Sequence, residues 1–140
     1  MDDIGDARYI ALTTFTRDGT PKATPVWLTG SDGTYRFYTG ADSWKIRRLR
    51  NDPAVELRVC DMRGRIEPNT VVHHGTGHVL DDDTSLAEVR DAVLRKYGWQ
   101  ARLVLLTDLI KQRFGKGQDP IAVRIDIEHS QLPNEVDRKI

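Results

Sequence analysis

The residues best suited to bind a ligand gather in one short stretch, Phe37 to Arg50. A strand-like run ends at Thr39, Gly40 provides a turn, and a helix-like run then begins near Ser43. The free N–H groups and the dipole at the start of a helix favour an anion there. This stretch is therefore a candidate anion-binding site.

Side chains of the same stretch add to that preference. Lys45 supplies a positive charge, Thr39 and Ser43 supply hydroxyl groups, and Arg48 lies one helical turn beyond Lys45 on the same side. These are the groups that a phosphate monoester needs. The same residues also fit a capped surface helix with solvated basic side chains, and the pattern alone leaves both interpretations open.

Other chemistry has weaker support. His74 and His78 share a strand face but would lie about 13 Å apart, too far to hold one metal ion, so no metal site is expected. Cys60 is the only cysteine and has no histidine partner nearby in the sequence, so we interpret it as structural. No Ser/His/Asp signature or acid pair is visible. That pattern fits hydride transfer, in which a coenzyme carries the chemistry and the protein positions it.

The elements that would position these residues are mostly strands. The Asp18-Gly19 and Asp32-Gly33 pairs predict hairpin turns. Pro25 cannot donate to a sheet, so its strand is expected at an edge or bulge. Gly75 and Gly77 predict that a long strand bends at a barrel corner or is closely approached by another backbone. The six predicted strands are Tyr9–Thr16, Lys22–Thr29, Thr34–Thr39, Ala54–Cys60, Thr70–Leu80 and Ile121–Glu128.

Three helices complete the prediction. A short one is expected from Asp42 or Ser43 through Arg50. Ser85 and Glu88 fit a capping box for a second helix that Gly98 ends, and an apolar stripe over Trp99–Phe114 predicts a third. Strands in hairpin sequence favour a small antiparallel barrel, mainly β, with a helical pair before its last strand.

The length and composition of the whole chain indicate the class of protein. Its 140 residues predict a single domain over 1–140, with a polar tail over 129–140. Lys+Arg and Asp+Glu both number 21, and this balance disfavours a nucleic-acid partner. No apolar run approaches the roughly 20 residues that span a membrane, and no secretion signal is visible. A cytoplasmic location is expected.

The ordered set of motifs resembles the flavin/deazaflavin oxidoreductase superfamily of pyridoxamine 5'-phosphate oxidase-like split barrels. The similarity lies in the Tyr38–Arg48 stretch, in Asn51-Asp52-Pro53 after it, and in the strand around Thr20–Trp27. The stretch Leu94–Gln100 is similar to the actinobacterial branch of probable coenzyme F420-dependent enzymes. The resemblance implies a six-stranded, FMN-binding-like split barrel and a homodimer.

The resemblance also implies roles for individual residues. Tyr38 and Thr39 would sit at the phosphate end of the coenzyme, and Ser43, Lys45 and Arg48 would bind the phosphate. The coenzyme ring would lie along a strand, largely by backbone contact, at Thr24, Pro25, Val26 and Trp27.

One departure from the family bears on the coenzyme. Pyridoxamine phosphate oxidases have an arginine where this chain has Trp44, which disfavours tight FMN binding. Coenzyme F420 is an 8-hydroxy-5-deazaflavin with a phosphodiester and an oligoglutamate tail, and the basic helix Lys45–Arg50 could meet that tail. The leading hypothesis is an oxidoreductase that moves a hydride between F420 and a small unsaturated substrate. The alternatives are an FMN enzyme of the same fold, and a non-catalytic deazaflavin- or haem-binding protein.

Overall fold

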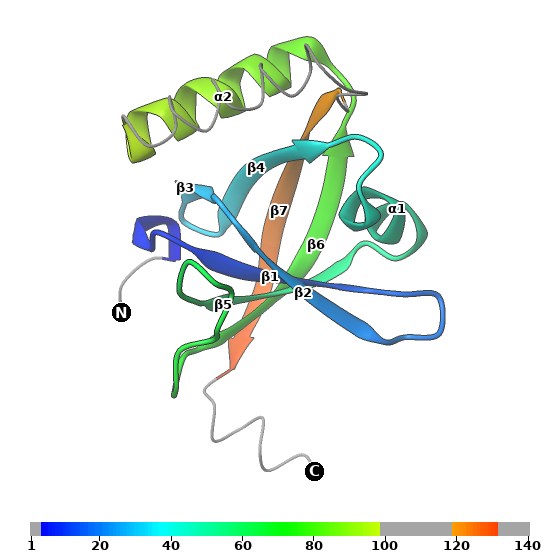
Figure 1. The fold of residues 1–140 in the computed structure, drawn as a ribbon, viewed down its shortest axis with the longest axis vertical. Coiled ribbons are helices and arrows are strands. Elements are labelled where there is room, and N and C mark those ends of the chain that lie inside the picture. The colour runs from blue at the N-terminus through cyan, green and yellow to red at the C-terminus, as the bar shows by residue number, and fades with distance from the viewer. Residues whose placement is uncertain (1–3, 99–118, 132–140) are drawn as a thin grey trace.

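A computed structural model describes residues 4–98 and 119–131 of the chain. One antiparallel sheet of seven strands forms its body, with two α-helices and a short 3-10 helix (Figure 1). The strands are β1 (Ile10–Phe15), β2 (Pro21–Val26), β3 (Thr29–Ser31), β4 (Thr34–Gly40), β5 (Ala54–Val59), β6 (Val72–Leu80) and β7 (Pro120–Gln131). The helices are η1 (Ile4–Asp6), α1 (Trp44–Asn51) and α2 (Asp83–Tyr97).

The strand order makes the sheet curl on itself. The order is β2-β1-β5-β6-β7-β4-β3, so β2 and β3 stand at opposite edges. Only Trp27 and Leu28 separate these two strands in the chain. Two linking residues reach at most about 11 Å, so the edges must lie close together. The result is the split barrel that the resemblance implies.

The sheet has one strand more than the six that the sequence predicts. The predicted strand Lys22–Thr29 ends at Val26, and a separate strand β3 begins at Thr29. The hydrophobicity of Trp27 and Leu28 hides this break, because both side chains pack into apolar clusters although they lie in the connection. The expectation for Pro25 is confirmed, since β2 is an edge strand.

The inner face of the sheet carries the main core. Side chains alternate between the two faces of β4 and β5, with Tyr35, Phe37, Val55 and Leu57 buried. Helix α1 closes this core with its two buried apolar side chains. The cluster comprises Ile4, Ile10, Leu12, Val26, Leu28, Tyr35, Phe37, Ile46, Leu49, Val55, Leu57, Val123 and Ile125.

Helix α2 packs on the outer face of the sheet at β3, β4 and β7 (Figure 1). Val89, Val93 and Tyr97 are its buried side chains. The predicted capping box at Ser85 is wrong. Asp82 caps the helix, and its carboxylate accepts the Ser85 backbone N–H at 2.8 Å. An aspartate three residues upstream offers the same acceptor, so the helix begins one turn earlier.

The last strand is longer than predicted. β7 continues through Gln131, so residues 129–131 belong to the sheet and not to a polar tail. His129, Ser130 and Gln131 pair with the first residues of β6, which supplies the backbone partners that the polar composition does not reveal. The remaining tail residues and the predicted third helix at Trp99–Phe114 lie outside the described residues.

Gly75 and Gly77 lie where neighbouring atoms approach β6 closely, and at Gly75 the neighbour is backbone, as one of the two predicted alternatives has it. The β6–β7 register shifts between His74 and Gly75. A Cβ built on Gly75 would lie 2.2 Å from the backbone oxygen of Asp126. A Cβ on Gly77 would lie 2.9 Å from the Leu49 side chain, which can move. The two glycines are therefore required for different reasons.

We predict that Gly75→Ala lowers the free energy of unfolding by about 3 kcal/mol, because β7 backbone must move. Gly77→Ala is the matched control and should cost only about 1 kcal/mol, because Leu49 can change rotamer. Urea unfolding of both variants measures the difference. Equal losses would contradict a backbone clash at Gly75.

Candidate anion-binding site

Ser43 begins the helix of the candidate site without capping it. It occupies the N-cap position of α1, yet its side chain makes no capping hydrogen bond. Its hydroxyl oxygen is buried and has no hydrogen-bond partner among the described residues. Leaving such a group unsatisfied costs about 1–3 kcal/mol. A ligand oxygen at this position would supply the partner.

Lys45 follows two residues later and is half-buried. Burial, and secondly the positive charge of Arg48, hold the pKa of Lys45 below its usual value of 10.5. In the part of the chain that the structure describes, no salt bridge joins a carboxylate to Lys45 or Arg48. The two cations therefore repel each other across a site that lacks a counter-charge.

Arg48 is held in place from β1. Its Nε donates a 2.7 Å hydrogen bond to the hydroxyl oxygen of Thr14, which is 1% exposed. This contact joins the helix to the inner face of the sheet, where Thr14 follows Ile10 and Leu12. The two terminal nitrogens of the guanidinium group form no ion pair within the described part of the chain and can serve a ligand.

Strand β2 brings polar side chains to the same inner face. In the β1–β2 ladder Leu12 pairs with Thr24 and Thr14 pairs with Lys22, and paired side chains share a face. The Thr24 hydroxyl is also buried without a hydrogen-bond partner among residues 4–98 and 119–131. Thr24 and Ser43 are thus two predicted site residues with unsatisfied buried hydroxyls.

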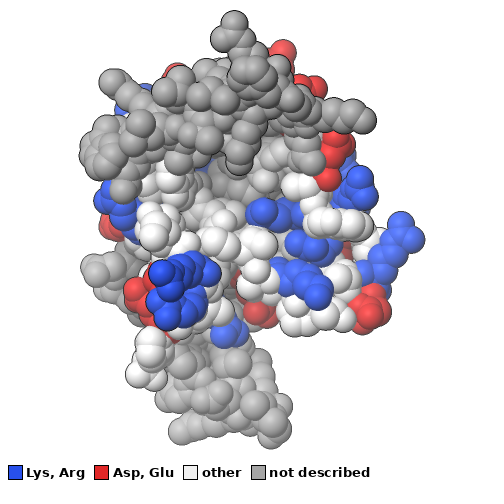
Figure 2. Space-filling model, in the orientation of Figure 1, with Lys and Arg blue, Asp and Glu red and all other residues white. Residues whose placement is uncertain are grey.

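The arrangement fits a phosphate. Two unsatisfied hydroxyls, a helix start and uncompensated cations are what a dianion binds through charge-assisted hydrogen bonds. Basic side chains gather on the part of the surface where α1 and the β1–β2 hairpin lie, with acidic ones mostly at the edge of the group (Figure 2). The balanced net charge of the chain hides this local excess.

The residues predicted along the coenzyme ring have divided environments. Val26 belongs to the inner core, and Trp27 stacks on Tyr97 with ring centroids 4.7 Å apart. Pro25 is exposed on the other face of β2, where a Cβ on Gly64 would come within 3.3 Å of its ring. The ring-binding role of these residues stays a prediction. Because the side chains of Val26 and Trp27 are packed within the protein, these two residues would contact the ring through their backbone.

The end of β4 also presents two faces. Tyr38 packs beneath α2, with the Arg90 guanidinium 6.0 Å from its ring centroid. Thr39 alternates with Tyr38 and so shares the inner side with Phe37, where it is half-buried. Of this pair, Thr39 has the side chain that can reach a ligand on the inner face.

Thr14 belongs to this site and Lys22 lies beside it, outside the phosphate-binding residues, although the sequence reasoning missed both. Thr14 had a signal, since it is a polar residue at an inward position of an otherwise apolar strand. Lys22 had none, because a lysine near a hairpin turn is ordinary. Only the strand register shows that it stands opposite Thr14.

Two other titratable groups, Cys60 and Tyr97, have raised pKa values and structural roles. Burial, followed by the charges of Asp61 and Glu67, raises the pKa of the Cys60 thiol. Burial raises the pKa of Tyr97 to about 12. The Tyr97 hydroxyl donates to the backbone oxygens of Arg8 and Leu28, at 2.8 and 3.4 Å. Neither group is poised to exchange protons near neutral pH.

The described residues contain no group of three or more His, Cys, Asp or Glu side chains that could hold a metal ion. No helix within them is long and apolar enough to cross a membrane.

We predict that Lys45→Met stabilises the coenzyme-free protein at pH 7. Because folding lowers the pKa of Lys45, its charged form opposes folding in full below that lowered pKa. The penalty is relieved as pH rises toward 10.5, so the wild type should gain stability relative to the variant over that window. Inorganic phosphate should stabilise the wild type more than the variant.

Urea unfolding of both proteins between pH 7 and 10.5 measures this stability gap. A variant that is less stable at pH 7, with a gap that does not change with pH, would show that Lys45 is a structural residue.

Comparison with known proteins identifies the family. The family model described as pyridoxamine 5'-phosphate oxidase matches residues 2–129. The conserved hypothetical protein Rv2991 of Mycobacterium tuberculosis is 23% identical, with a TM-score of 0.67 over 92% of this chain and 78% of that one. No curated protein matches at a significant level.

Two further solved structures share the fold. An F420 reductase is 17% identical, with a TM-score of 0.62 over 91% of this chain and 93% of that one. HutZ, the haem storage protein of Vibrio cholerae, is 13% identical, with a TM-score of 0.63 over 89% and 85%. At these identities the structures support the split barrel alone. The family match covers most of the chain, and the chain belongs to the pyridoxamine 5'-phosphate oxidase family within the flavin/deazaflavin oxidoreductase superfamily.

Proposed function

We propose that this protein is an oxidoreductase that uses the deazaflavin coenzyme F420 to transfer a hydride to or from a small unsaturated organic substrate. The observation that carries the proposal is the anion site: among the described residues no carboxylate forms a salt bridge with Lys45 or Arg48, and the buried hydroxyls of Ser43 and Thr24 have no hydrogen-bond partner. Family membership supports a flavin-type coenzyme as the ligand whose phosphate occupies this site.

The chain's own residues bind and orient the coenzyme. Lys45 and Arg48 hold the phosphate, with hydrogen bonds from the hydroxyls of Ser43 and Thr24. Thr14 fixes the direction of the Arg48 guanidinium. When bound, the coenzyme supplies the hydride chemistry. The edge strand β2 supports its ring, and the inner core beneath that strand excludes water from one side.

FMN is the first alternative, because the family is described by an FMN-type oxidase activity. Trp44 is the observation that disfavours it. Its side chain is 68% exposed and bears no charge where the oxidases have an arginine. A non-catalytic deazaflavin or haem carrier is the second alternative, and the structural likeness to HutZ keeps it open.

We predict that F420 binds more tightly than FMN at low ionic strength. Lys45→Met should weaken F420 binding by about tenfold to a hundredfold, because a charge-assisted contact to phosphate contributes roughly 1.5–3 kcal/mol. Fluorescence titration at low and high salt measures both effects. Tighter binding of FMN at both salt concentrations would replace the F420 proposal with the FMN alternative.

We also propose that the protein acts as a homodimer. The barrel interior is filled by its own apolar side chains, so a coenzyme of flavin size needs a second surface. The outer side of β2 offers one, since Pro21, Ala23 and Pro25 are exposed there without a covering helix among the described residues.

Light scattering at tens of micromolar should therefore give the mass of two chains. A monomer under these conditions would contradict the shared-site arrangement.

A further inference from the structure

The basic residues of α1 are not equally available to an anionic tail. Arg50 pairs with Asp81 at 3.1 Å, and the Arg47 guanidinium lies over the Trp44 ring at 4.9 Å. Lys45 and Arg48 face the phosphate site. The far end of α1 therefore offers less free positive charge than its sequence suggests.

The β1–β2 hairpin instead carries basic side chains that form no salt bridge among the described residues. Lys22 stands directly opposite Thr14, so the Cβ atoms of this pair lie about 5 Å apart on the inner face. Thr14 in turn accepts the hydrogen bond from Arg48. Lys22 is thus the next cation beyond the phosphate site in the direction of the hairpin turn.

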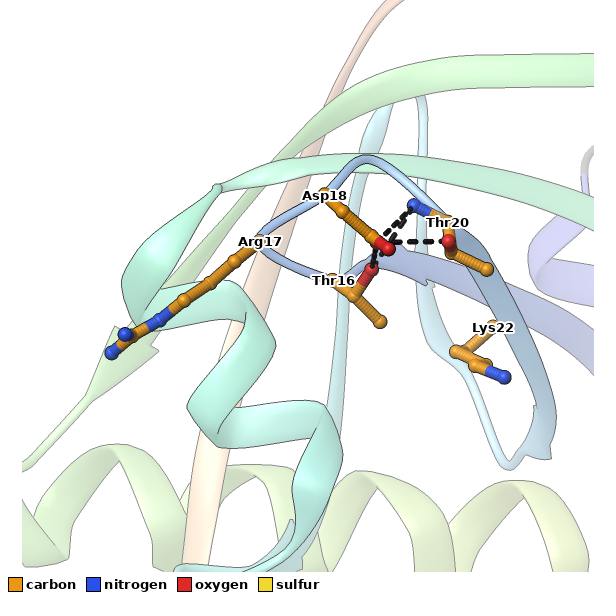
Figure 3. Close-up of a pocket in the computed structure, with 5 residues that line it drawn as sticks. All are labelled: Thr16, Arg17, Asp18, Thr20 and Lys22. Atoms are coloured by element: carbon orange, nitrogen blue, oxygen red, sulfur yellow. Dashed lines mark hydrogen bonds between the residues drawn. The ribbon is translucent and has the colours of Figure 1, made fainter.

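Lys22 also lines an open pocket at that turn. The pocket has a volume of about 400 Å³, and its lining residues are Thr16, Arg17, Asp18, Thr20 and Lys22 (Figure 3). Among the described residues, no salt bridge engages Arg17 or Lys22. In Figure 1 the hairpin turn and α1 lie on the same side of the molecule.

The one acid of this pocket is already satisfied by the turn. The Thr16 hydroxyl and the Thr20 hydroxyl and backbone N–H all donate to Asp18, and these hydrogen bonds lower its pKa to about 2. Figure 3 shows Asp18 turned across the loop toward both threonines, whereas Arg17 and Lys22 extend away from it to opposite sides of the hairpin. Separate carboxylates of one ligand can therefore meet Arg17 and Lys22 without displacing a salt bridge among the described residues.

We propose that the hairpin pocket binds the carboxylates of the coenzyme tail beyond the phosphate, with Lys22 and Arg17 as the binding residues. The proposal rests on the proposed use of F420. Under this proposal, the glutamates of the tail contact the β1–β2 hairpin rather than the far end of α1. The hairpin therefore makes the affinity for F420 depend on the oligoglutamate tail.

The test compares two ligands, F420 with its glutamates and the same coenzyme without them. For the wild type, the glutamates should tighten binding by about two- to twentyfold, since each exposed pair contributes little. In the double variant Arg17→Gln/Lys22→Gln this advantage should fall to about one, and the ligand without glutamates should bind as before. Both side chains are exposed, so the fold should persist.

Arg36→Gln is the matched control, because Arg36 is an exposed arginine on the outer face of β4 and should leave the advantage intact. High salt should reduce the advantage in the wild type. An advantage that survives in the double variant, or an equal loss for both ligands, would overturn the hairpin assignment. A wild type that binds neither ligand would overturn the use of F420 itself, before any variant is made.

Discussion

The connection between β2 and β3 is the constraint on which the rest of the structure depends. Two residues carry the chain from one edge of the sheet to the other, so the sheet must curl. The end of α2 holds this connection: Trp27 stacks on Tyr97, and the Leu28 carbonyl accepts hydrogen bonds from Lys96 and Tyr97. Curling brings the inner face of β2 toward the barrel core, where Thr24 pairs with Leu12 of β1.

The anion site uses the surface that this closure creates. The hydrogen bond from Arg48 to Thr14 ties α1 to β1, and the same strand pairs with β2. Cations and hydroxyls from three elements thus gather at one end of the barrel core. Their mutual repulsion, and the lack of partners among the described residues, are an energetic cost, which a bound phosphate would remove under the proposed function. The positive charge of Lys45 therefore lowers the stability of the empty protein, whereas under the proposed function it raises the affinity for the ligand.

Much of this could be predicted from residue patterns. Alternation in Ala54–Cys60 and the turn residues Asp18-Gly19 located strands correctly, because side-chain period and positive-φ turns are local properties. The break at Trp27 was missed, since both linking residues pack in apolar clusters and look like strand. The roles of Thr14 and Lys22 depend on register between strands, which a single sequence does not specify. For Tyr38, the pattern identified the segment but not the face, because α2 covers its ring.

The most direct test of this account is a crystal structure of the protein with F420 bound. The account predicts that the coenzyme phosphate lies within hydrogen-bonding distance of Lys45 and of the Ser43 hydroxyl, with the Arg48–Thr14 contact preserved. A phosphate bound elsewhere, with Lys45 and both buried hydroxyls still lacking partners, would contradict it.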